Sequence, residues 1–297
     1  MASENKIRHC VLCGRGKLKR LFSLDDHHFY RCKNCRLIQM SPLPQILSWG
    51  DDYSGYDLEK QQRFARVFSV PQFRRAIILI QKYKKKGKLL DVGCGTGEFL
   101  EAAREAGFLA TGIEPAETAC RIAAEKNEVI RGELRDVGLK EKSFDVVTLW
   151  SVLEHVPDPV SLLRKIHDSL KADGILALRI PSSSGLLPSL ALWLNKISAG
   201  KIDYPLRVIY QLEWHYQHVY FFNRKNIALL LNRCAFEILA ARRENSFDIK
   251  SLAYRMDYLP SGRISRLAFK TALFIILEFS LLLRRQDELV LIVRKSS

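Results

Sequence analysis

The chain has 297 residues, with 47 Lys and Arg against 32 Asp and Glu, a formal net charge of +15. Its 47% hydrophobic and 27% charged residues are those of a globular protein and exclude a fibrous or low-complexity chain. The positive excess indicates a polyanionic partner, either nucleic acid or an anionic membrane face, or only a basic solvated surface. The seven cysteines come without a visible secretory signal, so a reducing, cytoplasmic location is expected.

Four cysteines near the N-terminus form two C-x-x-C pairs, Cys10 with Cys13 and Cys32 with Cys35, separated by eighteen residues. This spacing is typical of zinc ribbons, because each turn directs two thiolates at one point and Zn²⁺ prefers a tetrahedral set of ligands. All four positions are used, so the predicted zinc is structural rather than catalytic. Four reduced cysteines in a loop-rich segment are the alternative. The ribbon is expected over residues 1–45, ending at SPLPQ.

After the ribbon, residues 46–87 carry aromatic and basic residues and are expected to form a helical linker that caps a cleft. Over residues 88–297, strand and helix patterns alternate. That alternation predicts an α/β fold with a doubly wound, mostly parallel sheet and helices on both faces. The expected strands are 89–93, 108–114, 128–132, 144–150 and 175–181, and the expected helices are 98–107, 116–126 and 159–174.

The first of these strands ends in a glycine-rich turn that contains Asp91, Gly93, Gly95 and Gly97. Glycines let a ligand approach the backbone closely, since no Cβ stands in the way. The pattern differs from the G-x-G-x-x-G of dinucleotide sites and from the G-K-[ST] of phosphate loops. Glu114 ends the next strand, 21 residues after Gly93, at the usual distance for an acid that binds two ribose hydroxyls. Asp91 would attract an ammonium group, so the predicted ligand is S-adenosylmethionine and not NAD.

The segments LLDVGCGTGEFL, GIEP and SFDVVTLWSVLEHVPDP resemble class I S-adenosylmethionine-dependent methyltransferases, over roughly residues 88–238. They are most similar to the branch of ubiquinone-biosynthesis O-methyltransferases and sugar methyltransferases. The ribbon, with RCKNCRLIQMSPLP, resembles the zinc module of nucleotide-sugar C-methyltransferases. The resemblance implies a Rossmann-like domain in which Asp91 and the three glycines line the methionine moiety and Glu114 holds the ribose.

The resemblance also implies the remainder of the cofactor site. Glu133 and Leu134 lie where the family places the adenine contact, although the family usually has Asp in place of Glu133. Trp150 and Ser151 follow the fourth strand and would form a wall of the cofactor pocket. Ordinary surface and core roles are the alternative for Glu133 and Trp150.

Two histidines are candidate bases that would remove a proton from the methyl acceptor, because histidine suits proton transfer near neutral pH. His218, in HVYFF, resembles the histidine of sugar C-methyltransferases, but Gln217 stands where that family has an acid. His155, in LEHV, is the second candidate. The alternative for His155 is a structural role that orients the loop, and the alternative for His218 is a packing or capping role beside Asn223. No N-P-P-[YF] motif of amine-methylating relatives follows the fourth strand, which favours oxygen or carbon. The predicted acceptor is a nucleotide- or lipid-linked sugar, or a similar small molecule.

Two other functions stay open. An RNA methyltransferase would use the ribbon and the basic surface to hold nucleic acid, although no interleaved aromatic and basic RNA-binding motif is recognisable. A binding scaffold that has lost its chemistry is the non-enzyme alternative, and the intact glycine loop with Glu114 argues against it.

Two apolar stretches, within residues 186–215 and 264–283, are expected to form lid segments. The second has the length of a membrane span, but Arg266, Lys270 and Glu278 interrupt it. A buried helix, a lid or an interfacial helix is therefore expected instead, and the interfacial helix would make the protein peripheral at the inner face of the membrane. The DELVLIVRK segment that follows is expected to return to the sheet as its last strand.

Overall fold

A central sheet organises the larger part of the chain. The structure is a computed structural model that describes residues 9–15, 17–43, 65–212, 217–246 and 263–296. The strands of this sheet are β4 (Gly87–Val92), β5 (Phe108–Glu114), β6 (Glu128–Arg131), β7 (Phe144–Trp150), β8 (Leu170–Pro181), β10 (Phe236–Glu244) and β11 (Glu288–Lys295). Over the described residues their order is β10-β11-β8-β7-β4-β5-β6. The strands from β8 to β6 are parallel, and β10 and β11 are antiparallel, so the predicted doubly wound, mostly parallel α/β fold is confirmed.

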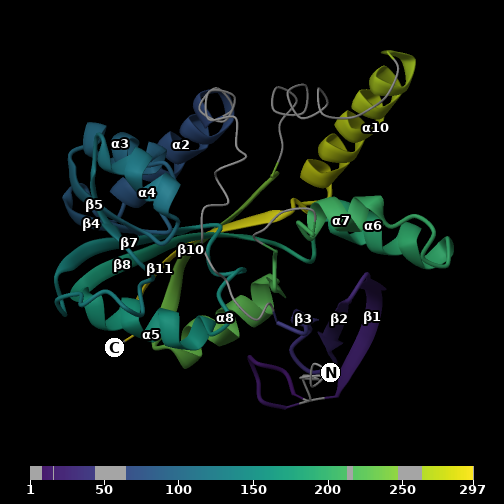
Figure 1. The fold of residues 1–297 in the computed structure, drawn as a ribbon, viewed down its shortest axis with the longest axis horizontal. Helices are drawn as coiled ribbons and strands as arrows, with labels where there is room; N and C mark the ends of the chain where they lie inside the picture. Colours follow the sequence, from purple (N-terminus) through teal and green to yellow (C-terminus); the bar gives the residue numbers. More distant parts are fainter. Residues whose placement is uncertain (1–8, 16, 44–64, 213–216, 247–262, 297) are drawn as a thin grey trace.

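Helices cover both faces of this sheet (Figure 1). One face carries α2 (Val70–Gln81), α3 (Glu98–Glu105) and α4 (Glu117–Ala124), and the other carries α5 (Pro159–Ser169) and α8 (Arg224–Arg233). The central strands read as continuous apolar runs because a parallel sheet is buried on both sides. The helix predicted over 159–174 is wrong in its last turn. It ends at Ser169, since Leu170 already pairs with Phe144 of β7.

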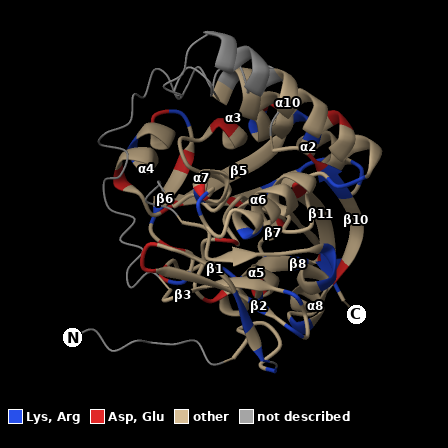
Figure 2. Cartoon of the chain, turned by 90° about the vertical axis from the view of Figure 1, so that its right-hand side faces the viewer, with Lys and Arg blue, Asp and Glu red and all other residues tan. Residues whose placement is uncertain are grey.

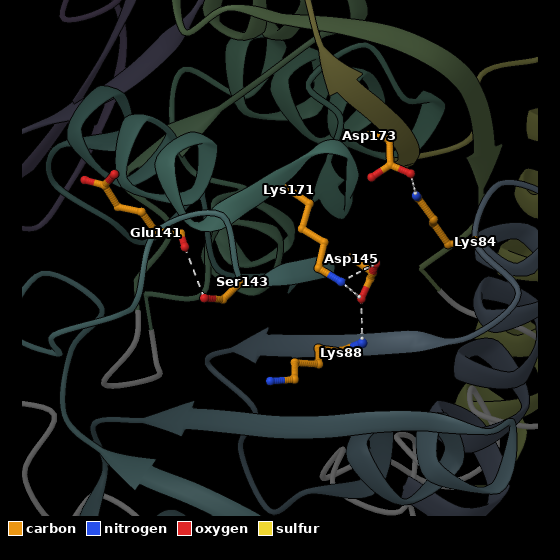
Figure 3. A network of polar contacts seen from close by, with 7 residues as sticks. All are labelled: Lys84, Lys88, Glu141, Ser143, Asp145, Lys171 and Asp173. Carbon is orange, nitrogen blue, oxygen red and sulfur yellow. Dashed lines mark hydrogen bonds and ion pairs between the residues drawn. The ribbon is translucent and has the colours of Figure 1, made fainter.

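Charged side chains tie three neighbouring strands together at their amino ends (Figure 3). The Asp145 carboxylate in β7 accepts hydrogen bonds from Lys171 Nζ of β8, at 2.8 and 2.9 Å, and from the Lys88 N–H of β4, at 2.8 Å. Burial acts to raise the pKa of Asp145, but these partners outweigh it and lower that pKa below its ordinary value. The strands are thereby held in register at the end of the sheet opposite to the site described below.

A second, smaller sheet joins the N-terminal segment to the rest of the chain. Its antiparallel strands are β1 (Leu18–Leu24), β2 (His27–Cys32), β3 (Ile38–Ser41) and β9 (Tyr220–Phe221). Phe22 stacks on Phe29 at 4.6 Å between ring centroids, and Tyr210 packs edge-on against both. The predicted ribbon therefore shares a sheet and an aromatic core with residues near 210 and 220. The expected boundary at residue 45 lies outside the described residues. Of the expected 46–87 linker, η1 (Ala65–Ser69) and α2 are helical, and 46–64 are not described.

The two predicted apolar segments contain α6 (Leu186–Ile197), α7 (Tyr204–Ile209) and α10 (Arg263–Leu282), all on one side of the molecule (Figure 1). The side chains of α10 are described from residue 271 onward. Phe279 and Leu282 are 52% and 76% exposed, whereas Leu277 is buried. Interpreting 264–283 as a buried helix is therefore wrong for its described part. Among the described residues, no helix has the length and apolar character that crossing a membrane requires.

Candidate functional site

A cavity of ≈ 520 Å³ lies where the strand order of the central sheet reverses, between β4 and β7. In open α/β sheets, ligands bind beyond the carboxyl ends of the strands at such a point. The loops that follow β4, β5, β6 and β7 supply most of its wall, and Gln211 after α7 adds to it. Of the predicted cofactor residues, those lining the cavity are Gly93, Gly95, Glu114, Glu133, Leu134, Trp150 and Ser151. Asp91 and Gly97 do not line it.

The glycine loop has a backbone conformation that favours glycine at all three of its glycine positions. Gly93, Gly95 and Gly97 have φ of +73°, +55° and +92°, which side chains with a Cβ rarely adopt. Gly95 has nothing within 4 Å of where a Cβ would stand, so open space faces it. At Gly97, which precedes α3, a Cβ would lie 2.8 Å from Nδ2 of Asn127. Gly93 and Gly95 both line the cavity, but a Cβ on Gly93 would lie 2.7 Å from Cγ2 of Val152, so only Gly95 faces open space. Gly97 lets α3 pack closely.

The two acidic residues near the loop occupy different depths. Glu114 lines the cavity, and its carboxylate accepts the N–H of Gly95 at 2.8 Å and of Ala116 at 2.9 Å. Asp91 is 1% exposed below the cavity wall and accepts a 2.6 Å hydrogen bond from Oγ1 of Thr148. Burial raises the pKa of Asp91 to about 8 and also raises that of Glu114. The Asp91 side chain therefore supports the loop from beneath, and its predicted contact with the methionine moiety stays a prediction.

The remaining predicted cofactor residues form two walls. Glu133 pairs with Arg135 at 2.9 Å, next to the buried Leu134. On the other side, the Trp150 indole packs against Phe99 at 5.0 Å between ring centroids, and its buried Nε1 has no hydrogen-bond partner among the described residues. Ser151 has φ +57°, which turns the chain sharply after β7. All four residues line the same cavity, as one cofactor site would require, and the roles assigned to them stay predictions.

The two predicted histidines lie side by side, with ring centroids 4.8 Å apart. His155 lines the cavity, and its Nδ1 lies 3.0 Å from the carbonyl oxygen of Gln217. Because a carbonyl only accepts, Nδ1 carries the proton and Nε2 is left as an acceptor. Burial lowers the pKa of His155 to about 4 and lowers that of His218 well below its ordinary value. His218 itself is 6% exposed and stands behind His155.

A third group of this cluster, Glu154, was missed by the sequence reasoning. Its Oε1 lies 4.0 Å from Nε2 of His218, it is fully buried, and neither carboxyl oxygen has a hydrogen-bond partner among the described residues. Burial raises its pKa to about 8, so the group is largely protonated at neutral pH. The sequence has Gln217, and not an acid, directly before His218. In the fold the carboxyl group beside His218 comes from Glu154, the residue that precedes His155. The signal was present in LEHV, because Glu154 directly precedes a candidate base. Two imidazoles and a carboxyl group within 4.8 Å of one another can share a proton or hold a cation.

The cavity residues fit S-adenosylmethionine. Glu114 is held by two backbone donors and keeps lone pairs that two ribose hydroxyls can use. The open space at Gly95 admits a ligand against the backbone. Leu134 and Trp150 offer apolar surface of the kind that encloses an adenine ring.

The four N-terminal cysteines fit a zinc ion. Their sulfur atoms all lie within 4.8 Å of one another, with Cys10 Sγ 3.5 Å from Cys35 Sγ and Cys13 Sγ 3.7 Å from Cys32 Sγ. Tetrahedral Zn–S bonds of about 2.3 Å separate sulfurs by roughly 3.8 Å, close to these distances. The hydrogen bond from Cys35 lowers the pKa of the Cys10 thiol to about 5. The predicted cysteine set is therefore brought together with the chemistry and spacing of a structural zinc site.

The comparisons with known proteins concern the central domain. The profile of the family described as "Methyltransferase domain" matches residues 59–241. A ubiquinone biosynthesis O-methyltransferase of Haemophilus ducreyi is 41% identical over 103 residues, covering 31% of this chain and 44% of that protein. Its counterpart from Actinobacillus pleuropneumoniae is 39% identical over 103 residues, covering 30% and 43%. The chain thus spans less than half of the length of these curated relatives.

Solved structures are similar to this chain in fold. A S-adenosylmethionine-dependent methyltransferase from Archaeoglobus fulgidus has a TM-score of 0.53 at 18% identity, covering 81% of this chain and all of that one. A methyltransferase from Haloferax volcanii, solved with its Trm112 activator, has a TM-score of 0.58 at 12% identity, covering 83% and 97%. At these identities the likeness establishes the Rossmann-like fold and nothing about the acceptor.

Proposed function

Because this chain belongs to the methyltransferase-domain family and carries an S-adenosylmethionine-dependent methyltransferase domain, we propose that it methylates an oxygen or carbon atom of a sugar that is nucleotide- or lipid-linked. The observation that carries this proposal is His155, a neutral imidazole in the cavity wall whose Nε2 is free to accept a proton. Cofactor-holding residues, a candidate base and the basic side chain of Lys165 all line the cavity and support this proposal.

The cofactor residues proposed here are those that line the cavity. Glu114 would accept hydrogen bonds from the ribose hydroxyls, and Gly93 with Gly95 would let the methionine portion approach the backbone. Glu133 and Leu134 would contact the adenine, with Trp150 and Ser151 on the opposite wall. When bound, S-adenosylmethionine supplies a methyl group on a cationic sulfur. The protein mainly has to align the acceptor with that methyl and remove water and a proton.

His155 is the proposed base. Its Nδ1–H is held by the Gln217 carbonyl, which keeps Nε2 unprotonated and oriented. A hydroxyl acceptor would pass its proton to Nε2 as the oxygen takes up the methyl group, leaving a cationic imidazolium. His218 and Glu154 lie directly behind His155, with Glu154 Oε1 4.0 Å from His218 Nε2. We assign them a positioning role, because neither lines the cavity.

The proposed acceptor is anionic, since Arg135 and Lys165 both line the cavity. Lys165 Nζ donates to the Arg135 carbonyl oxygen at 2.7 Å, whereas the Arg135 guanidinium pairs with Glu133 at 2.9 Å and with Asp136 at 3.6 Å. A diphosphate linking a sugar to a nucleoside or a lipid has the charge that these residues suit. Asp158 also lines the cavity and offers a hydroxyl-binding carboxylate. The zinc ribbon supports this choice only through its resemblance to nucleotide-sugar enzymes.

The experiment is label transfer from isotopically methyl-labelled S-adenosylmethionine into a cell extract, followed by fractionation. We expect label in nucleotide-sugars or glycolipid, and we expect His155→Gln to reduce it strongly. His167→Gln is the matched control, because His167 lies on α5 beside Asp168 and away from the cavity. Label found in RNA would replace the sugar proposal with the nucleic-acid one. Full turnover in His155→Gln would remove that residue as the base.

We also propose that the four cysteines hold one structural zinc ion. The sulfur spacing supports this, and every ligand position is a cysteine, so no site is left for a substrate. Metal analysis of the purified protein should find one zinc per chain, and Cys32→Ser should lose it. Zinc retained at full occupancy by Cys32→Ser would contradict the assignment.

A further inference from the structure

Each of three helices presents an apolar stripe to solvent. On α6, Trp193 and Ile197 are one turn apart and are 55% and 59% exposed. On α7, Tyr204 and Val208 have the same spacing and are 55% and 38% exposed. Side chains four positions apart in a helix lie on one face, so each pair forms a continuous stripe. The exposed large side chains are therefore ordered and not scattered.

The described part of α10 repeats this pattern over a longer distance. Ile275, Phe279 and Leu282 are 47%, 52% and 76% exposed, and Leu283 after the helix is 54% exposed. Leu277 on the opposite side is buried, but Phe274 and Leu281 near it are 41% and 49% exposed, so apolar exposure extends around much of the described helix. An amphipathic helix normally turns such a stripe toward a core. Here the stripe faces solvent.

The stripes belong to one face of the molecule. The end of α10 lies against the start of α6, where Arg285 Nη2 donates to Ser189 Oγ at 2.6 Å and the Leu186 N–H donates to the Arg285 carbonyl oxygen at 2.7 Å. Figure 2 shows α6, α7 and α10 on the side that faces the viewer, with mostly uncharged residues along α6 and the described part of α10. We call this surface, made of the exposed apolar side chains of α6, α7 and α10, the apolar face.

Positive charge accompanies the apolar face. Lys196, Lys201 and Arg284 are exposed beside the stripes. The acids are fewer. Glu278 is exposed on α10, and the Asp203 carboxylate already accepts from Arg207 Nε at 2.9 Å. Exposed aromatic side chains mixed with lysine and arginine are typical of segments that lie in a membrane interface.

We propose that the apolar face docks on an anionic membrane, with its stripes at the boundary between headgroups and acyl chains. A protein partner suits the face less well, because lysine is depleted in the cores of protein interfaces, whereas it attracts anionic lipid. The face is also connected to the site, since Val208 of α7 lies three residues before Gln211, which lines the cavity. The proposal does not depend on the acceptor being a sugar.

The test is flotation of the full-length, zinc-loaded protein with vesicles of phosphatidylcholine alone or mixed equally with phosphatidylglycerol. We expect binding to the anionic vesicles, and weaker binding at high salt. The triple variant Ile275→Ser, Phe279→Ser, Leu282→Ser should lower the partition coefficient at least about tenfold. The matched control is Leu109→Ser with Ile130→Ser, which removes exposed apolar side chains of β5 and β6 at the far edge of the sheet.

Titration with S-adenosylmethionine shows that each variant is folded, since no substituted residue lines the cavity. Two outcomes overturn the proposal. One is wild-type protein that remains with neither vesicle type. The other is wild-type protein that light scattering shows to be a dimer in solution and that the triple variant converts to monomer. The face would then belong to a second copy of the chain.

Discussion

Replacing Glu114 by Gln tests the cofactor site at one well-defined side chain. Its two carboxyl oxygens accept different backbone N–H groups, Oε2 from Gly95 at 2.8 Å and Oε1 from Ala116 at 2.9 Å. The residue is 6% exposed, so water cannot readily replace a lost partner. An amide has a single oxygen. In Glu114→Gln one N–H therefore keeps its acceptor, and the other meets an NH₂ group.

The magnitude follows from these contacts. A buried donor left without an acceptor costs about 1–3 kcal/mol, and a hydrogen bond from ribose to a charged group is worth a further ~1.5–3 kcal/mol. The first cost falls on the free protein and destabilises the turn that contains Gly95. The second is lost only when the cofactor binds. Since about 1.4 kcal/mol is tenfold in affinity, we expect the Kd for S-adenosylmethionine to rise roughly 10- to 100-fold.

Isothermal titration with S-adenosylmethionine and S-adenosylhomocysteine measures this directly and needs no acceptor. Glu117→Gln is the matched control, because Glu117 is exposed, pairs with Arg131 at 2.6 Å and does not line the cavity. The control should bind as the wild type does. If Glu114→Gln also bound within about twofold of wild type, Glu114 would not hold the ribose and the argument from its geometry would be refuted.

Three further predictions concern stability and the ribbon. Burial lowers the pKa of His155 to about 4, so the unfolded chain, with an imidazole pKa of ~6.5, takes up its proton first. That contribution to stability is complete above pH ~6.5 and is lost as the pH falls toward 4, by about 3 kcal/mol. Urea unfolding at several pH values in this range should therefore show that the free energy of unfolding depends less steeply on pH in His155→Gln than in the wild type. Phe29→Ala removes a fully buried ring and should lower the free energy of unfolding by about 3–5 kcal/mol in the same assay. In Cys32→Ser, metal loss should lower the melting temperature while the Kd for S-adenosylmethionine stays within about threefold of wild type, since no ribbon residue lines the cavity.

Sequence reasoning was strongest where the chemistry is local in the chain. The alternating strand and helix patterns predicted the doubly wound sheet. The glycine loop and Glu114 lie at the carboxyl ends of adjacent strands β4 and β5, so their meeting at one cavity follows from the order of strands. The two C-x-x-C pairs likewise needed only one hairpin, β1 with β2, to bring four sulfurs together.

Contacts between distant segments were beyond such reasoning. Glu154 beside His218, and the Gln217 carbonyl on His155, join residues more than sixty positions apart. The Gln217 side chain also reaches His27 Nε2 in the ribbon, at 3.3 Å and 190 positions away. The hydrophobic periodicity of a sequence cannot predict such a contact, because the contact depends on how β9 packs against β3.

The sequence by itself therefore determined the fold class, the glycine loop, the acid that follows it and the cysteine cluster, because each depends on near neighbours or on strand order. Only the tertiary structure decided that Asp91 lies beneath the cavity wall and that His155, not His218, reaches the cavity. It also decided that α10 turns its apolar stripe outward. Burial and orientation are properties of the packed molecule, since the same apolar pattern serves a core or an interface until its neighbours are in place.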